Sequence, residues 1–99
     1  MDQDSIHMPA ETLKAILESG AEDYILLDVR TPEEHQEENI GGKNIPVNIL
    51  ANTLDDIDLS KKIITYCKSG GRSTRACEIL KQAGATEVYS LIGGITDYK

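Results

Sequence analysis

The sequence predicts an α/β fold in which helices cover both faces of a central parallel sheet. Apolar runs of strand length alternate along the chain with segments whose apolar residues recur at helical spacing. Each run is apolar at consecutive positions, which is typical of strands that are buried on both faces. The 99 residues are enough for one domain, 1–99, and leave no room for a second.

A short helix and a buried strand are predicted near the beginning of the chain. Pro9 suits a first helical turn and Gly20 suits a helix end, and the apolar residues between them have helical spacing: Leu13, Ile16 and Leu17. Residues 24–27 then form an apolar run that leads into Asp28 and Arg30. We expect a fully buried strand that ends in charged side chains at one rim of the sheet.

A second helix is predicted directly after this strand. Thr31 at the N-cap, Pro32 at the first helical position and Glu34 at the third form a capping box. The acidic residues of this helix are interpreted as a solvated face: Glu33, Glu34, Glu37 and Glu38. Residues 44–47 indicate a short edge strand, because Pro46 could not donate a hydrogen bond within a central ladder.

The second half of the chain repeats the order of strand and helix. Residues 63–66 are β-branched and aromatic, which indicates a buried strand. A helix that ends at Gly84 follows, with apolar residues on one face: Ala76, Ile79, Leu80 and Ala83. Residues 88–91 predict the last strand, and Gly93 and Gly94 turn the chain into a final helical segment.

Cys67 lies where the strand at 63–66 enters a glycine-rich, cationic loop that opens a helix. The loop residues are Lys68, Ser69, Gly70, Gly71, Arg72 and Ser73. Free N–H groups of the first helical turn, together with two cations, favour the thiolate over the thiol. We therefore predict a nucleophilic Cys67 whose pKa lies below the ordinary value of about 8.5. The alternative is a small buried hydrophobic residue beside a simple turn.

The charge distribution predicts a small anionic substrate. The net charge of −7 argues against nucleic acid and against an anionic membrane surface as partners. Half of the basic residues nevertheless lie in a stretch with no acid between Asp58 and Glu78: Lys61, Lys62, Lys68, Arg72 and Arg75. Such a basic mouth on an acidic body attracts small anions, although a solvated basic face without a role is the alternative.

Other sequence features limit the expected location and cofactors. The chain has no apolar run near 18 residues and no basic start followed by an apolar segment, so we expect a cytoplasmic location. A monomer is expected as well. Cys67, Cys77, His7 and His35 do not have the spacing of a disulfide framework or a zinc site, so no metal and no cofactor are expected. Cys77 is predicted to pack in a helix rather than to act as a resolving thiol. His7 and His35 have no convergent partners in the sequence.

Three motifs together resemble the rhodanese-like domain family, which includes single-domain thiosulfate sulfurtransferases. They lie at residues 27–34, 66–73 and 91–95 and cover nearly the whole chain in their order and spacing. The resemblance implies a five-stranded parallel sheet. It also implies that Cys67 takes a sulfane sulfur as a persulfide and passes it to a thiophilic acceptor. Residues 38–43 differ from the turn that is common in relatives. This difference affects the expected conformation of the turn and not the assignment of Cys67 as the nucleophile.

The resemblance also suggests roles for the surrounding residues. The amides of the loop would hold the negative sulfur, while Lys68 and Arg72 would attract and orient an anionic donor such as thiosulfate, with Arg72 as the bidentate partner. The acceptor would be cyanide or a thiol, including a thiol on an acceptor protein. Asp28 and Arg30 are expected to form a structural pair or loop brace, with substrate contact by Arg30 as the alternative.

Two other functions remain open from the sequence. Cysteine phosphatases of this fold have a C-x5-R loop, whereas Cys67 and Arg72 form a shorter C-x4-R loop, and Tyr66 stands where many phosphatases have His. The shorter loop suits a single sulfur atom better than a phosphoryl group, so sulfur transfer is preferred. Some rhodanese-like domains serve as binding or regulatory modules, but those often lack the cysteine or the cationic loop.

Overall fold

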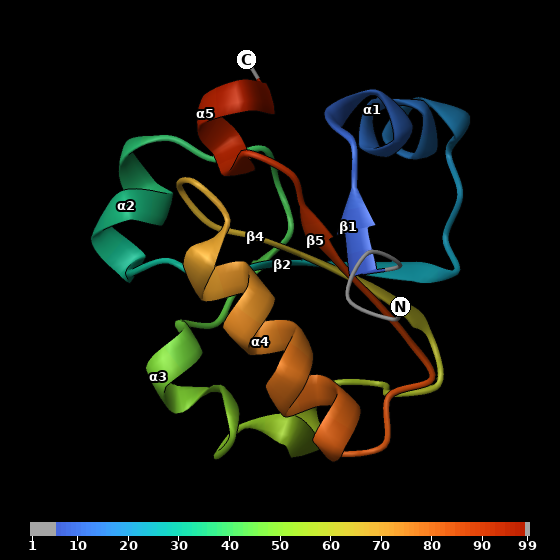
Figure 1. The fold of residues 1–99 in the computed structure, drawn as a ribbon, viewed down its shortest axis with the longest axis vertical. Coiled ribbons are helices and arrows are strands. Elements are labelled where there is room, and N and C mark those ends of the chain that lie inside the picture. Colours follow the sequence, from blue (N-terminus) through green and yellow to red (C-terminus); the bar gives the residue numbers. More distant parts are fainter. Residues whose placement is uncertain (1–5, 99) are drawn as a thin grey trace.

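The computed structural model describes residues 6–98, which form a five-stranded parallel sheet with helices packed on it (Figure 1). The strands are β1 (His7–Met8), β2 (Tyr24–Asp28), β3 (Lys43–Asn44), β4 (Lys62–Tyr66) and β5 (Glu87–Leu91). The helices are α1 (Ala10–Ser19), α2 (Pro32–Glu37), α3 (Val47–Leu50), the short 3-10 helix η2 (Leu54–Asp56), α4 (Gly71–Gln82) and α5 (Gly94–Tyr98). This architecture confirms the predicted α/β fold.

The strand order is β1-β5-β4-β2-β3, and all neighbouring strands are parallel. Successive residues of a strand point to opposite faces, so Leu26 and Ile64 belong to one hydrophobic core while Leu27 and Ile63 belong to another. The first core also contains residues of α1 and α5, and the second contains residues of α3 and α4. Figure 1 accordingly shows α1 and α4 on opposite sides of the sheet.

The ends of β2 and β4 define the rim on which the candidate site is built. These strands pair in register, with Leu26 opposite Ile64 and Asp28 opposite Tyr66. Because parallel strands end at the same edge of a sheet, the segment after Asp28 and the segment after Tyr66 lie side by side. The backbone N–H of Val29 donates to the carbonyl of Tyr66 at 3.0 Å and continues the pairing past the ends of both strands.

Some predicted boundaries were wrong for identifiable reasons. The edge strand expected at 44–47 is limited to Lys43–Asn44, because Pro46 becomes the N-cap residue of α3. Proline has no N–H to lose at a helix start, which makes it suitable there. Strand β1 and helix α3 were not predicted, since neither is long enough to show a periodic pattern. None of the helices in residues 6–98 is both long and apolar enough to cross a bilayer.

Candidate active site

Cys67 directly follows β4, and its sulfur lies inside the loop that leads to α4. The backbone N–H of Gly70 donates to Sγ at 3.0 Å, and that of Ser73 donates at 3.4 Å. Gly70 has φ = 120°, a value that residues with a side chain rarely adopt, and this lets the loop turn its amides inward. The result is a compact cradle around one sulfur atom. Cys67 is only 1% exposed, so the sulfur lies beneath the loop surface.

Hydrogen bonds control the acidity of Cys67. Burial raises the pKa of its thiol, but hydrogen bonds from the Ser73 hydroxyl and from the N–H groups of Ser73, Gly70 and Ser69 outweigh this and lower the pKa below its ordinary value. The predicted direction of the shift and the role of the loop N–H groups agree with this, whereas the Ser73 hydroxyl was not predicted and Lys68 and Arg72 are not among the causes. Burial instead raises the pKa of the Cys77 thiol, so the two cysteines differ in direction.

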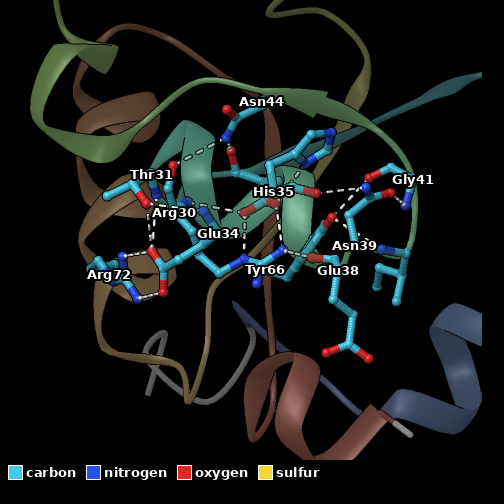
Figure 2. Close-up of polar contacts among 12 residues, drawn as sticks. Arg30, Thr31, Glu34, His35, Glu38, Asn39, Gly41, Asn44, Tyr66 and Arg72 are labelled. Atoms are coloured by element: carbon cyan, nitrogen blue, oxygen red, sulfur yellow. Dashed lines mark hydrogen bonds and ion pairs between the residues drawn. The ribbon is translucent and has the colours of Figure 1, made fainter.

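Arg72 is already paired in this structure. Its Nη1 donates to Glu34 Oε1 at 2.7 Å and its Nη2 to Glu34 Oε2 at 3.1 Å, which joins α4 to α2 (Figure 2). Glu34 also completes the capping box with Thr31, as predicted, and the Arg72 hydrogen bond is the main cause that lowers the pKa of Glu34 to about 2. The prediction that Glu34 belongs to a merely solvated face was therefore wrong.

Lys68 is exposed and forms no ion pair within residues 6–98. It lines an open groove of about 470 Å³ on one side of the loop, together with Arg30, Glu34, Glu37, Glu38, Ile95 and Thr96. A second open groove of about 480 Å³ lies on the other side and includes Ser69, Gly70, Gly71 and Ile92. Lys68 is thus the loop cation that is free to meet a solute.

Asp28 and Arg30 form a buried ion pair beside the loop. Arg30 Nε donates to Asp28 Oδ1 at 2.9 Å, and Arg30 Nη2 donates to Oδ2 at 2.7 Å. Burial raises the pKa of Asp28, but hydrogen bonds from Arg30 and His35 lower it below its ordinary value. Arg30 Nη2 also donates to the carbonyl of Glu38 at 2.6 Å, and the guanidinium lies 5.5 Å from the centre of the Tyr66 ring.

His35 joins the same cluster, which we call the brace: Asp28, Arg30, His35 and Tyr66. Its Nδ1 lies 2.8 Å from Asp28 Oδ2, so the expectation that His35 has no convergent partner was wrong. The Tyr66 hydroxyl donates to the carbonyl of Gly41 at 2.9 Å, and burial raises the pKa of Tyr66 to about 12. Asp28 ends β2 and His35 lies in α2, and no pattern in the sequence indicates that these two side chains meet.

The end of the third family motif, residues 91–95, and the residue after it bind the backbone of the cysteine loop. The N–H of Ile95 donates to the carbonyl of Cys67 at 2.8 Å, and the N–H of Thr96 donates to that of Lys68 at 3.2 Å. Gly94, with φ = 61°, lies against both carbonyl oxygens and leaves no space for a Cβ atom. The sequence predicts only a turn at Gly93 and Gly94, and this latch between α5 and the loop was not predicted.

No group of three His, Cys, Asp or Glu side chains suited to a metal ion occurs within residues 6–98. Both cysteines are free and buried, and Cys77 contacts the Thr65 hydroxyl at 3.5 Å on the inner face of α4. The groups that this structure brings around the Cys67 sulfur are therefore backbone N–H groups and the Ser73 hydroxyl, with charged side chains at the rim.

Comparison with known proteins agrees with this architecture. The profile of the Rhodanese-like domain family matches residues 9–99. A sulfurtransferase from Allochromatium vinosum is 36% identical over 78 residues, which are 78% of this chain and 73% of that protein. The uncharacterized protein YqhL from Bacillus subtilis is 40% identical over 70 residues, or 70% of this chain, and the match spans only 56% of YqhL.

A solved structure extends the match to the whole fold. The BH2092 protein from Bacillus halodurans superposes with a TM-score of 0.85 at 31% identity, over 99% of this chain and 74% of that one. The strand order, the cysteine loop after β4 and the family profile over residues 9–99 lead to the same assignment. This chain belongs to the rhodanese-like domain family.

Proposed function

We propose that this protein is a sulfurtransferase that carries a sulfane sulfur on Cys67. The observation that supports this most directly is the cradle of Gly70 and Ser73 N–H groups around the Cys67 sulfur. Family membership and relatives that are named sulfurtransferases support the same activity. A thiolate that is already favoured by its surroundings needs no separate general base.

The reaction has two displacement steps. The Cys67 thiolate attacks the outer sulfur of thiosulfate, so that a new S–S bond forms, the old S–S bond breaks, and sulfite leaves with the bonding electron pair. A thiolate or cyanide acceptor then attacks the outer sulfur of the persulfide, and Cys67 leaves as a thiolate. The loop N–H groups stabilise negative charge on sulfur at each stage without reorganising.

Donor attraction is assigned mainly to Lys68. It is exposed at a groove beside the loop, while both outer nitrogens of Arg72 are bound to Glu34. A dianion such as thiosulfate is drawn toward an unpaired ammonium, and this attraction weakens as salt is added. Arg30 lines the same groove, but its guanidinium is bound to Asp28 and the Glu38 carbonyl, so we assign it to the brace.

Mass spectrometry of the intact protein after incubation with thiosulfate tests this proposal. We expect a mass increase of one sulfur atom that disappears after addition of a thiol reductant. Cyanide should remove the same mass and release thiocyanate. Cys67→Ser should remove the increase entirely, because an alkoxide does not carry a sulfane sulfur, whereas the matched variant Cys77→Ser should keep it.

Three results would contradict the proposal, and the last of them is given by a folded protein with neither activity. One is a mass increase that persists in Cys67→Ser, which would place the sulfur elsewhere. Another is no increase in the wild-type protein together with hydrolysis of an aryl phosphate, which would favour the phosphatase alternative. Absence of both activities in folded protein would favour the binding module.

A further inference from the structure

Three hydroxyl groups lie behind the Cys67 sulfur, and two of them are fully buried. Ser73 Oγ is 3.6 Å from Cys67 Sγ and 2.6 Å from Ser90 Oγ, which comes from the neighbouring strand β5. Ser73 and Ser90 are 0% and 1% exposed. Thr74 Oγ1 is 3.5 Å from Ser90 Oγ and 2.8 Å from the carbonyl of Gly70. The sulfur is thus connected to β5 by a short chain of hydroxyls.

The Ser73 proton has three acceptors within reach. Ser73 Oγ donates to the carbonyl of Gly70 at 3.1 Å, and this carbonyl also accepts from the N–H of Thr74 at 3.0 Å and from the hydroxyl of Thr74 at 2.8 Å. A carbonyl oxygen has two lone pairs, so the third and longest of these hydrogen bonds is the weakest. Rotation of the Ser73 hydroxyl directs the same proton to Ser90 Oγ or to the Cys67 sulfur instead.

The contact between Ser73 and Ser90 holds one proton, so one serine donates and the other accepts. If Ser73 donates to Ser90, Cys67 receives no hydroxyl hydrogen bond. If Ser90 donates to Ser73, the Ser73 proton is free to point at the sulfur. The second arrangement is favoured when the sulfur is negative, since a hydrogen bond to an anion is about twice as strong as one between neutral groups.

We infer that Ser90 is a positioning residue for the cysteine: its hydroxyl donates to Ser73 Oγ and thereby directs the Ser73 proton to the negative sulfur on Cys67. The chain runs from Ser90 to Ser73 to Cys67 in the thiolate and reverses when the thiol donates to Ser73. No bond is broken in this change, because only the hydroxyl protons rotate. This inference deepens the proposed function, since it names a residue outside the loop that controls the charge on the sulfur carrier.

The ordinary alternative is that Ser90 is a small residue that fits between β5 and α4. A packing role predicts that Ser90→Ala, which nearly conserves volume, leaves the titration of Cys67 unchanged. A positioning role predicts a shift, because Ser73 would lose its donor and its own proton would no longer be directed. The two roles are therefore separated by the pH dependence of the thiolate and not by stability.

The test is an ultraviolet titration of the Cys67 thiolate in the full chain. Each variant is measured with and without the additional change Cys67→Ser, and the difference isolates Cys67 from Cys77 and the tyrosines. For Ser90→Ala we expect the midpoint to rise by less than roughly one pH unit, which is the size of a hydrogen bond to the anion lost altogether, because Ser73 keeps its hydroxyl but loses the donor that orients it. Ser90→Thr keeps a hydroxyl, so its midpoint should lie close to that of the wild-type protein.

Thr65→Val provides a matched control. It removes another buried hydroxyl, which contacts Cys77 and the carbonyls of Ser73 and Tyr89 but not the Cys67 sulfur. Its midpoint should equal that of the wild-type protein, and urea unfolding verifies that each variant is folded. An unchanged midpoint in Ser90→Ala, or an equal shift in Thr65→Val, would overturn the inference.

The titration uses no sulfur donor, so its outcome is independent of the proposed function. A shift in Ser90→Ala without any sulfur loading of the wild-type protein would overturn sulfur transfer and keep the hydroxyl chain. Sulfur loading of the wild-type protein without a shift in Ser90→Ala would keep sulfur transfer and overturn the role of Ser90.

Discussion

The cysteine loop (residues 67–73) and the brace lie at the ends of neighbouring strands, but negative charge is stabilised by different groups in the two regions. In the brace, the Asp28 carboxylate is neutralised by the Arg30 side chain at 2.7 Å, and both groups are buried. In the loop, the Cys67 sulfur is surrounded by N–H groups and a serine hydroxyl and has no ion-pair partner in the described residues. The carboxylate of the brace thus has a fixed counterion, whereas the sulfur of the loop has only hydrogen-bond donors around it.

This difference explains why the cysteine loop, and not the brace, is suited to the proposed sulfur transfer. A buried ion pair resists change, because removing one partner leaves an uncompensated charge in a poorly solvated site. Backbone N–H groups stabilise whichever atom in the cradle carries the negative charge, so the charge can move from the cysteine sulfur to a second sulfur. The brace is therefore suited to holding the rim of the sheet in place, and the loop is suited to the proposed transfer of sulfur.

The largest expected effect on stability is that of Asp28→Asn in the brace. Loss of the carboxylate leaves Arg30 buried without its counterion, and we expect the free energy of unfolding to fall by about 3 kcal/mol. Urea unfolding measures this, with Glu78→Gln as a control that removes the exposed pair with Arg75 and should cost less than about 0.5 kcal/mol. Equal costs in the two variants would refute the structural role of the brace.

A smaller loss is expected for Gly94→Ala, which affects the latch of the loop. The added Cβ would overlap the carbonyls of Cys67 and Lys68, and φ = 61° is unfavourable for alanine. We expect a destabilisation of about 2 kcal/mol together with slower sulfur loading. Gly20→Ala has a similar φ of 76° but open space around the Cβ, so it isolates the backbone strain and should leave sulfur loading unchanged. Equal loading rates in both variants would argue against the latch.

The loop charges are expected to alter donor binding more than stability. Lys68→Ala should raise KM for thiosulfate roughly threefold and reduce its salt dependence, because an exposed attraction is lost. Arg72→Ala should have a smaller effect, since Glu34 already binds both of its outer nitrogens. This reverses the order expected if Arg72 were the free bidentate partner.

Glu34→Gln sharpens this prediction. It should lower KM about twofold by uncovering the charge of Arg72, and the double variant Glu34→Gln with Arg72→Ala should not show this gain. Steady-state kinetics at low and high salt measure both effects. A larger KM increase for Arg72→Ala than for Lys68→Ala would show that the donor displaces Glu34.

The smallest effect is the pH dependence of the Glu34–Arg72 pair. The folded pKa of Glu34 is lowered from 4.5 to about 2, mainly by Arg72, so its contribution to stability is present above pH 4.5 and is lost as the pH falls through about 2. Because both side chains are partly exposed, the stability difference between wild type and Glu34→Gln should be below about 1 kcal/mol at neutral pH. Urea unfolding at several pH values should show this difference shrinking in acid. A constant difference would mean that Glu34 acts through packing.

Local patterns in the sequence determined the fold class, the main strands and the position of the cysteine. Consecutive apolar residues predicted strands buried on both faces, and the capping box at Thr31 predicted the start of α2. The family motifs implied the five-stranded sheet. The strands and the capping box depend on interactions between residues near one another in the chain, or on periodicity within one element, so they are visible without knowing the fold, whereas the number of strands followed only from the family resemblance.

The tertiary structure alone decided which groups surround Cys67 and which charges are already satisfied. Glu34 meets Arg72, Asp28 meets His35, Ser90 meets Ser73, and Gly94 meets the Cys67 carbonyl. Each of these four contacts joins two different segments of the fold, and the Asp28–His35 contact joins the end of β2 to α2. Sequence spacing does not encode such distances; they follow from the strand order β1-β5-β4-β2-β3, which brings β5 and β2 to opposite sides of β4 and its cysteine.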